Sequence, residues 1–259
     1  MDKKAYLEIR HLHKTFTVSA GVFSGRSARV PAVNDVTFSV TRGETLGRVG
    51  ESGCGKSTLA RLLLNLMQPD SGQVIFEGAN IYDLTAARMK QFRKRVQIIF
   101  QDPLSSLNPR KKVGSIIGEP LLIHRIVHKQ HVAERVCELM QTVGLSPESI
   151  NRYPHEFSGG QRQRIGIARA LRLSPDCIIA DEPVSALDVS IQAQTINLLV
   201  DLQHQLQLTY VFISHDLSVV RHVSTRVAVM YLGKILELAP SVQLYDAPVN
   251  RYVADFVGE

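Results

Sequence analysis

Alternating apolar and polar positions predict a β-rich beginning to this chain. VTFSV (residues 36–40) alternates, and ETLGRV (residues 44–49) follows it after a T-R-G turn. Alternation is typical of strands with one buried face, so we expect a hairpin or two neighbouring strands here. Between Thr17 and Pro31 the Gly/Ser/Arg-rich stretch SAGVFSGRSAR predicts a mobile loop.

A helical period replaces this pattern after Gly50. Leucines recur there at helical spacing and predict one apolar face, formed by Leu59, Leu62, Leu63 and Leu66. SGQVIFEGANI (residues 71–81) then returns to short strands separated by turns. A strand followed by a helix at Gly50 is the first element of an α/β fold.

The second half of the chain predicts helices and then buried strands. From about Thr85 to Gly144 the period is mostly helical, and we interpret Gln101 to about Arg152 as a helical insertion. CIIA (residues 177–180) and YVFI (residues 210–213) are short continuous apolar runs, typical of buried parallel strands. We expect a helix over residues 191–206 between them, and VAVMYL-GK-ILEL predicts a hairpin across Gly233-Lys234.

The composition indicates the charge of the binding partners but does not identify one. The 259 residues are 44% hydrophobic, which suffices for a sizeable core, and the net charge of +6 with a pI near 9.3 indicates anionic partners. Three separated cysteines form no C-x-x-C pair, so a reducing compartment is expected. The first residues lack the apolar core of a signal peptide, and no run reaches the ~18 apolar residues that span a bilayer.

Two clusters invite readings that the sequence does not favour. A helical stretch carries a basic run that could bind nucleic acid, formed by Arg88, Lys90, Arg93, Lys94 and Arg95. No aromatic residues lie between these charges to stack on bases, and such a run is more often the solvated face of a helix. Three histidines in a charged helical stretch are likewise expected at the surface and not on a metal: His124, His128 and His131.

The strongest motif is GESGCGKS at residues 50–57, which fits G-x-x-x-x-G-K-[ST] between a strand and a helix. Glycines let the backbone wrap phosphate oxygens. Lys56 is expected to reach the β- and γ-phosphates, and the Ser57 hydroxyl is expected to bind Mg²⁺. The motif in this context predicts nucleotide binding.

Polar residues at the ends of predicted strands are candidates for metal binding and for catalysis. Asp181, which follows an apolar strand, suits Mg²⁺, and Glu182 can act as general base on a water near the γ-phosphate. His215 ends YVFISH, where it could contact the γ-phosphate or orient the water, and Gln101 follows a further apolar run and could bind Mg²⁺ or water. Alone, each could be structural.

A second glycine loop, FSGGQRQR, opens another helix at residues 157–164. Backbone N–H groups at a helix N-terminus favour anions, so this loop predicts a second anion site.

In this order the motifs resemble those of the ATP-binding subunits of ABC transporters, and the resemblance covers nearly the whole chain. FQDPLSSLNPR, ADEPVSALDVSIQAQTINLL and ISHDLSVVRHVS are similar to the branch that imports peptides and nickel. The resemblance implies an α/β fold: a P-loop NTPase core with an N-terminal antiparallel β-subdomain and a helical signature-motif subdomain. It implies one domain over residues 1–259, with the core in 1–100 and 173–240, the helical subdomain in 101–172 and a short tail in 241–259.

The same resemblance implies roles for single residues. Phe16 would stack on adenine, Asp188 would help shape the interface with a second ATPase subunit, and Gln101 would sense Mg²⁺ and signal to the membrane subunits. The signature loop would hold the γ-phosphate of the partner's ATP through Ser158, Gly159, Gly160 and Gln161. ATP and Mg²⁺ would be bound by Phe16, Gly50, Glu51, Ser52, Gly53, Cys54, Gly55, Lys56, Ser57, Thr58 and Gln101, with Asp181 as a further metal ligand.

Partners and location follow from the resemblance as expectations. They are two membrane-spanning permease subunits, a second ATPase subunit that in this branch is commonly a different chain, and, indirectly, an extracytoplasmic solute-binding protein. The chain would be peripheral, on the cytoplasmic face of a bacterial membrane. One alternative is a soluble ABC-type ATPase acting on nucleic acid or ribosomes; such proteins usually fuse two ATPase units or carry a long coiled coil. A regulatory module without turnover is disfavoured by Glu182 and His215.

Three features depart from the family pattern. Phe157 replaces the commoner leucine. Arg48 stands in LGRVG where an apolar strand residue is usual, so we expect an acidic partner or an exposed strand, because burying an unpaired charge is costly. Long members carry a C-terminal extension that is missing here, as expected of a short member or a truncated chain.

Overall fold

The computed structural model describes residues 5–19 and 27–258 of the chain. It divides into two compact units, one formed by Met1–Phe92 with Val211–Glu259 and the other by Arg93–Tyr210. The division of the domain predicted from the sequence stays a prediction, and the two units are described in turn.

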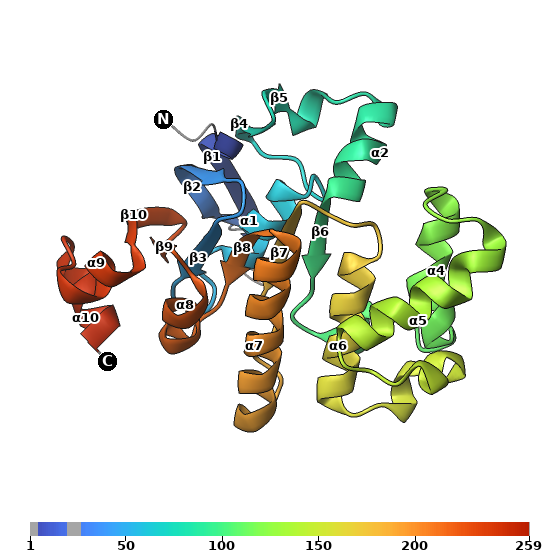
Figure 1. Cartoon of the computed structure of the whole chain (residues 1–259). Coiled ribbons are helices and arrows are strands. Elements are labelled where there is room, and N and C mark those ends of the chain that lie inside the picture. Colours follow the sequence, from blue (N-terminus) through green and yellow to red (C-terminus); the bar gives the residue numbers. More distant parts are fainter. Residues whose placement is uncertain (1–4, 20–26, 259) are drawn as a thin grey trace. The chain divides into compact units, whose positions relative to one another are not determined.

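The first unit contains a four-stranded antiparallel sheet (Figure 1). Its strand order is β2-β1-β4-β5, with β1 at Ala5–Ser19, β2 at Ser27–Thr41, β4 at Ser71–Phe76 and β5 at Ala79–Asn80. The long strands β1 and β2 extend into both sides of the predicted loop between Thr17 and Pro31, whose centre, residues 20–26, lies outside the described residues.

A second sheet of this unit has β3 (Thr45–Val49) beside β9 (Arg226–Tyr231), which pairs with β10 (Lys234–Pro240). β3 and β9 are parallel and β9 and β10 antiparallel, and β3 also neighbours β8 (Thr209–Ile213), whose last three residues belong to this unit. All five residues of β3 are buried, so the strand before the glycine loop lies in the core.

Two strand predictions were wrong in detail. β2 and β3 follow one another but lie in different sheets, so they form no hairpin. The buried Glu44 explains the separation: its carboxylate accepts from Thr41 N (2.8 Å) and pairs with Arg226 on β9 (3.0 Å), which ties the start of β3 to β9. The β9–β10 turn is Leu232-Gly233, one residue earlier than predicted, because both residues take a positive φ (45° and 82°), as a tight hairpin turn requires.

Helices complete the first unit. α1 occupies Lys56–Leu63 and buries Leu59, Leu62 and Leu63 as predicted, whereas Leu66 lies beyond the helix and is 57% exposed. Asn65 causes this difference, because its φ of 50° turns the chain out of the helix. The other helices are η1 at Ile81–Asp83, α2 at Ala86–Arg95, which ends in the second unit, α8 at Leu217–Val223, α9 at Ser241–Asp246 and α10 at Arg251–Gly258.

The second unit contains the parallel pair β6 (Val96–Ile99) and β7 (Cys177–Asp181), and β7 neighbours β8. β6 interrupts the stretch predicted as mostly helical. The predicted helical insertion and the predicted helix near residues 191–206 are present: α3 at Pro103–Ser106, α4 at Val113–Ile123, η2 at Lys129–His131, α5 at Val132–Thr142, η3 at Pro147–Asn151, η4 at Pro154–Glu156, α6 at Gly159–Leu171 and α7 at Val189–Leu206.

Among the described residues, none of the helices combines the length and the apolar character that crossing a membrane demands.

Candidate nucleotide-binding and catalytic site

The glycine loop at residues 50–57 connects β3 to α1, and its shape depends on two glycines. Gly55 has φ 100°, and a Cβ there would lie 1.8 Å from the carbonyl oxygen of Ala32 on β2. Gly50 has φ 154°, and its Cβ would lie 2.2 Å from the carbonyl oxygen of Met230. No side chain fits either position, so the loop is packed tightly against β2 and β9.

The ammonium group of Lys56 is enclosed by its own loop. Lys56 is 5% exposed, and its Nζ donates hydrogen bonds to the carbonyl oxygens of Gly50 (2.7 Å) and Glu51 (2.8 Å). The positive charge therefore lies beside the loop, where a phosphate cradled by the loop amides would meet it. Ser57 and Thr58 are half-buried in the first turn of α1.

Arg48 is buried, and the expectation of an exposed strand was wrong. It is 1% exposed on β3, and its Nη1 donates a 2.8 Å hydrogen bond to the carbonyl oxygen of Lys56. Its Nη2 contacts the sulfur of Met230. Arg48 thus fixes the first residue of α1, which is also the lysine of the glycine loop.

Phe16 lies on β1 near the glycine loop. It is 36% exposed and pairs with Val30 of β2, two residues before Ala32, whose carbonyl oxygen adjoins Gly55. A partly exposed ring on a firmly paired strand could stack on a planar base beside the loop, as the resemblance implies.

His215 is exposed in a turn that is fixed on both sides. Before it, the Ser214 amide donates to the Arg48 carbonyl oxygen (3.1 Å). After it, the Asp216 amide donates to Ser214 Oγ (3.0 Å), and the Asp216 carboxylate caps α8 through the amides of Ser218 (2.8 Å) and Val219 (3.2 Å). A fixed backbone beneath an exposed imidazole suits contact with a ligand.

In the second unit, the predicted amide and the predicted base meet directly. Gln101 follows β6 and Glu182 follows β7, and Ile99 pairs with Ala180 in the parallel ladder, so both strands end at the same edge. There Gln101 Nε2 donates a 3.0 Å hydrogen bond to Glu182 Oε2. Sequence reasoning assigned each residue separately, and the structure brings them together.

Glu182 has an unusual backbone. Its φ is 46°, in the left-handed region that non-glycine residues seldom adopt, and its carbonyl oxygen accepts from the Ser185 amide (3.3 Å) and hydroxyl (3.2 Å). Strained residues of this kind cluster at functional sites. Asp181 just before it ends β7 and is only 8% exposed.

The oxygen donors predicted for Mg²⁺ fit that ion. A serine hydroxyl (Ser57), a carboxylate (Asp181) and an amide oxygen (Gln101) are the hard ligands that Mg²⁺ prefers. The described part of the chain has no cluster of three or more His, Cys, Asp or Glu side chains suited to a metal.

The signature loop forms the N-terminus of α6 through a capping box. Ser158 is the N-cap: its Oγ accepts from the Gln161 amide (3.3 Å), and Gln161 Oε1 accepts from the Ser158 amide (3.0 Å). Ser158, Gly159 and Gln161 are exposed. The two side chains pre-shape a helix end whose backbone favours an anion.

The two glycines of this loop have different surroundings. A Cβ at Gly160 would lie 2.5 Å from Cγ2 of Ile191 on α7, whereas a Cβ at Gly159 would be 3.8 Å from the nearest atom, Cδ2 of Leu187. Gly160 is therefore needed for packing of α6 against α7. The open surroundings of Gly159 make it the position where an added side chain would reach toward an anion at the helix end.

Asp188 occupies the N-cap position of α7 without a side-chain capping bond and is exposed. Its role at an interface with a second ATPase subunit stays a prediction.

Sequence reasoning missed Arg169. On α6 it lies over the ring of Phe100 (5.2 Å to the centroid) and donates to the carbonyl oxygen of Ser106, and burial lowers its pKa. It therefore joins the signature helix to the segment that contains Gln101. The available signal was a charged residue on the apolar stretch IGIARAL.

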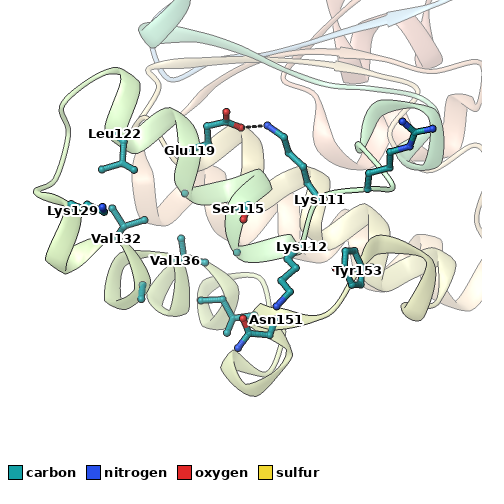
Figure 2. Close-up of a pocket in the computed structure, with 15 residues that line it drawn as sticks. Lys111, Lys112, Ser115, Glu119, Leu122, Lys129, Val132, Val136, Asn151 and Tyr153 are labelled. Atoms are coloured by element: carbon teal, nitrogen blue, oxygen red, sulfur yellow. Dashed lines mark hydrogen bonds and ion pairs between the residues drawn. The ribbon is translucent and has the colours of Figure 1, made fainter.

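A groove of about 740 Å³ lies between α4 and α5 of the second unit (Figure 2). Lys111, Lys112 and Lys129 line it, with Lys111 paired to Glu119, and its floor is apolar at Leu122, Val132, Val136 and Ile150. This combination suits a partner segment with one apolar face and acidic flanks.

Comparisons with known proteins agree with these motifs. The family model described as "ABC transporter" matches residues 33–185. The chain is 55% identical over 252 residues to the oligopeptide transport ATP-binding protein AppF of Bacillus subtilis (strain 168), covering 97% of this chain and 77% of that protein. It is 52% identical over 248 residues to OppF of the same organism, covering 95% and 79%.

A solved structure shares the fold. The dimeric ATP-binding cassette MJ0796, bound to ADP and Pi, superposes with a TM-score of 0.79 at 26% identity, over 91% of this chain and 98% of that one. Fold, motifs and relatives agree, and the expected P-loop core with its antiparallel sheet and helical segment is confirmed. The chain therefore belongs to the ABC transporter family and carries that family's ATPase domain.

Proposed function

We propose that this chain binds and hydrolyses ATP to drive the import of peptides through partner membrane subunits. The observation that carries the proposal is the bond between Gln101 and Glu182 at the shared end of β6 and β7. A carboxylate held there by an amide can orient and deprotonate a water, which a merely nucleotide-binding module would not require.

The chemistry uses groups whose geometry is described above. Lys56 and the loop amides bind the β- and γ-phosphates, and Mg²⁺, when bound, neutralises charge that develops on them. Glu182 accepts a proton from water as the water oxygen attacks the γ-phosphorus and the bond to the ADP oxygen breaks. A carboxylate accepts several hydrogen bonds, so Glu182 can hold both Gln101 and the water. His215 contacts the γ-phosphate or orients the water.

A second ATPase subunit completes the site in this proposal. The end of α6 supplies Ser158, Gly159, Gly160 and Gln161 to the partner's ATP, and Asp188 lies at the interface. The exposed capping box supports this role, and MJ0796 is itself a dimer in its ADP-bound structure. The partner is a different chain or a second copy of this one.

Peptides are the proposed cargo because the relatives AppF and OppF are named for oligopeptide transport. Nickel remains the second cargo class of the same branch. The relatives are transport proteins, which gives no support to the alternative of an ATPase acting on nucleic acid or ribosomes.

The groove between α4 and α5 is the proposed docking surface for a permease subunit, which would hold the chain on the cytoplasmic face of a bacterial membrane. A solute-binding protein outside would deliver the cargo. Leu122→Glu should weaken assembly by about tenfold or more, because it places a charge where an apolar contact forms. Ile123→Glu is the matched control, since Ile123 is the next residue and even more exposed but does not line the groove.

The deciding experiment measures ATP hydrolysis and peptide uptake by the chain assembled in proteoliposomes with the membrane subunits, the second ATPase and the binding protein. We expect hydrolysis that rises with peptide-loaded binding protein and stops in Glu182→Gln. Hydrolysis stimulated by DNA or ribosomes in the absence of membrane subunits would overturn the proposal.

A further inference from the structure

The turn between β9 and β10 is bonded to the glycine loop on one side and to β2 on the other. The amide of Gly233 donates a hydrogen bond to the carbonyl oxygen of Cys54 in the loop (3.2 Å). The carbonyl oxygen of Gly233 accepts one from the amide of Asn34 on β2 (2.8 Å). The two peptide groups that flank this single residue therefore join the loop to β2.

Only a glycine fits at this position of the turn. Gly233 has φ 82° and follows Leu232, which has φ 45°. A Cβ at Gly233 would lie 2.8 Å from the carbonyl oxygen of Pro31 and 3.2 Å from that of Ala32. The Ala32 oxygen is also the atom that a Cβ at Gly55 would meet, so the turn and the glycine loop both approach the same peptide group of β2.

The bond from Gly233 also fixes the direction of a loop amide. The Cys54 carbonyl and the Gly55 N–H belong to one peptide group, and the described residues contain no cis peptide bond. In a planar trans peptide the N–H points opposite to the carbonyl, so the Gly55 N–H is directed away from the turn. Within the described part of the chain this N–H has no protein acceptor, which leaves it for a phosphate oxygen.

We propose that Gly233 is a positioning residue for phosphate binding. It holds the Cys54–Gly55 peptide group so that the Gly55 amide faces the phosphates, and its own bond to Asn34 anchors this contact on β2. The inference rests on the proposed ATP binding and deepens it, because it assigns part of the shape of the glycine loop to a turn far along the chain that lies outside the motif.

The chain offers a matched control in the turn between β4 and β5. Glu77 and Gly78 have φ 49° and 88°, close to the values of Leu232 and Gly233, but no atom lies within 4 Å of a Cβ at Gly78. Gly78→Ala and Gly233→Ala therefore introduce the same backbone strain at equivalent turn positions. Only Gly233→Ala forces the turn away from β2 and from the loop.

The test measures the Kd of ATP for the full chain by calorimetry. We expect Gly233→Ala to bind ATP about three- to tenfold more weakly, as the loss of one positioning hydrogen bond dictates, and Gly78→Ala to stay within about twofold of wild type. Gly233→Asn is the second variant. Asparagine tolerates a positive φ but keeps the Cβ, so this chain folds with less strain and its ATP binding should remain weak.

Proton–nitrogen correlation NMR spectra give a local measurement that a general loss of stability would not change. The Gly55 amide resonance should shift in Gly233→Ala and stay in place in Gly78→Ala. An unchanged ATP Kd in Gly233→Ala, an equal loss in Gly78→Ala, or wild-type affinity in Gly233→Asn would overturn the inference. If the wild-type chain itself binds no ATP, the proposed function fails instead, so the two failures are distinguishable.

Discussion

Gly159→Asp should abolish transport while leaving the isolated chain as stable as wild type or more so. Gly159 is the first residue of α6, and a Cβ there meets nothing closer than 3.8 Å, so the side chain can be accommodated. The first turn of α6 has no acidic residue, and an acid in that position stabilises a helix by about 0.3–1 kcal/mol. Replacing a helical glycine adds a few tenths of a kcal/mol more. The expected gain of up to ~1 kcal/mol raises Tm by about 2–4 °C.

In the assembled complex the same carboxylate would face the phosphates of the partner's ATP. Juxtaposed like charges cost several kcal/mol, which corresponds to a loss of two to three orders of magnitude in turnover. Gly159→Asn is the neutral control of equal size and separates bulk from charge. Gly160→Asp is unsuitable for this test because its side chain would first collide with Ile191.

The assay pairs two measurements on each variant. Calorimetry gives the ATP affinity of the lone chain, which should match wild type because the loop around Lys56 is untouched. Proteoliposomes give ATP hydrolysis and peptide uptake of the complex, which should be lost for Asp and much less impaired for Asn. A parallel fall of affinity in the lone chain would refute the reasoning, because the signature loop would then serve this chain's own ATP.

Three further outcomes are expected. Glu182→Gln should bind ATP normally and stop hydrolysis, since the amide keeps the shape but accepts no proton; near-normal turnover would place the base elsewhere. Lys56→Ala should weaken ATP binding by a few kcal/mol, on the order of one or two charged hydrogen bonds, which calorimetry would detect. Gly160→Ala should destabilise the chain by about 1–3 kcal/mol in urea unfolding, because its Cβ lies 2.5 Å from Cγ2 of Ile191, and adding Ile191→Ala should restore much of this loss.

The meeting of Gln101 and Glu182 could be predicted because the information that places them is local in sequence. The glycine loop needs its strand and helix on either side, and residues at the ends of parallel strands meet without further information, as Gln101 and Glu182 do. A strand that is buried on both faces needs a continuous run of apolar residues, so such a run predicts its position. β7 accordingly lies where CIIA predicted a strand.

Sequence reasoning failed where a distant partner decides the outcome. β2 and β3 looked like a hairpin, but the pairing of Glu44 with Arg226, far along the chain, assigns β3 to another sheet. The role of Gly160 depends on Ile191, which belongs to a different helix. Neither contact has a signature in the local pattern, because apolar spacing reports that a face is buried and not what buries it.

Arg48, which is buried, and Arg169, which is half-buried, show that a charged residue within an apolar run carries information of its own. Arg48 and Arg169 both stand in stretches that otherwise read as core, and burying a bare charge there would cost several kcal/mol. In each case a backbone carbonyl oxygen accepts from the guanidinium, that of Lys56 for Arg48 and that of Ser106 for Arg169. Both acceptors belong to segments that carry site residues, the glycine loop and the segment after Gln101. A guanidinium has five donors in a fixed fork, so it can fix the end of a helix beside it, here the start of α1 and the end of α3. An arginine in a core stretch therefore predicts that it holds the end of a neighbouring segment through a backbone carbonyl oxygen, and this rule would single out Arg169 from IGIARAL alone.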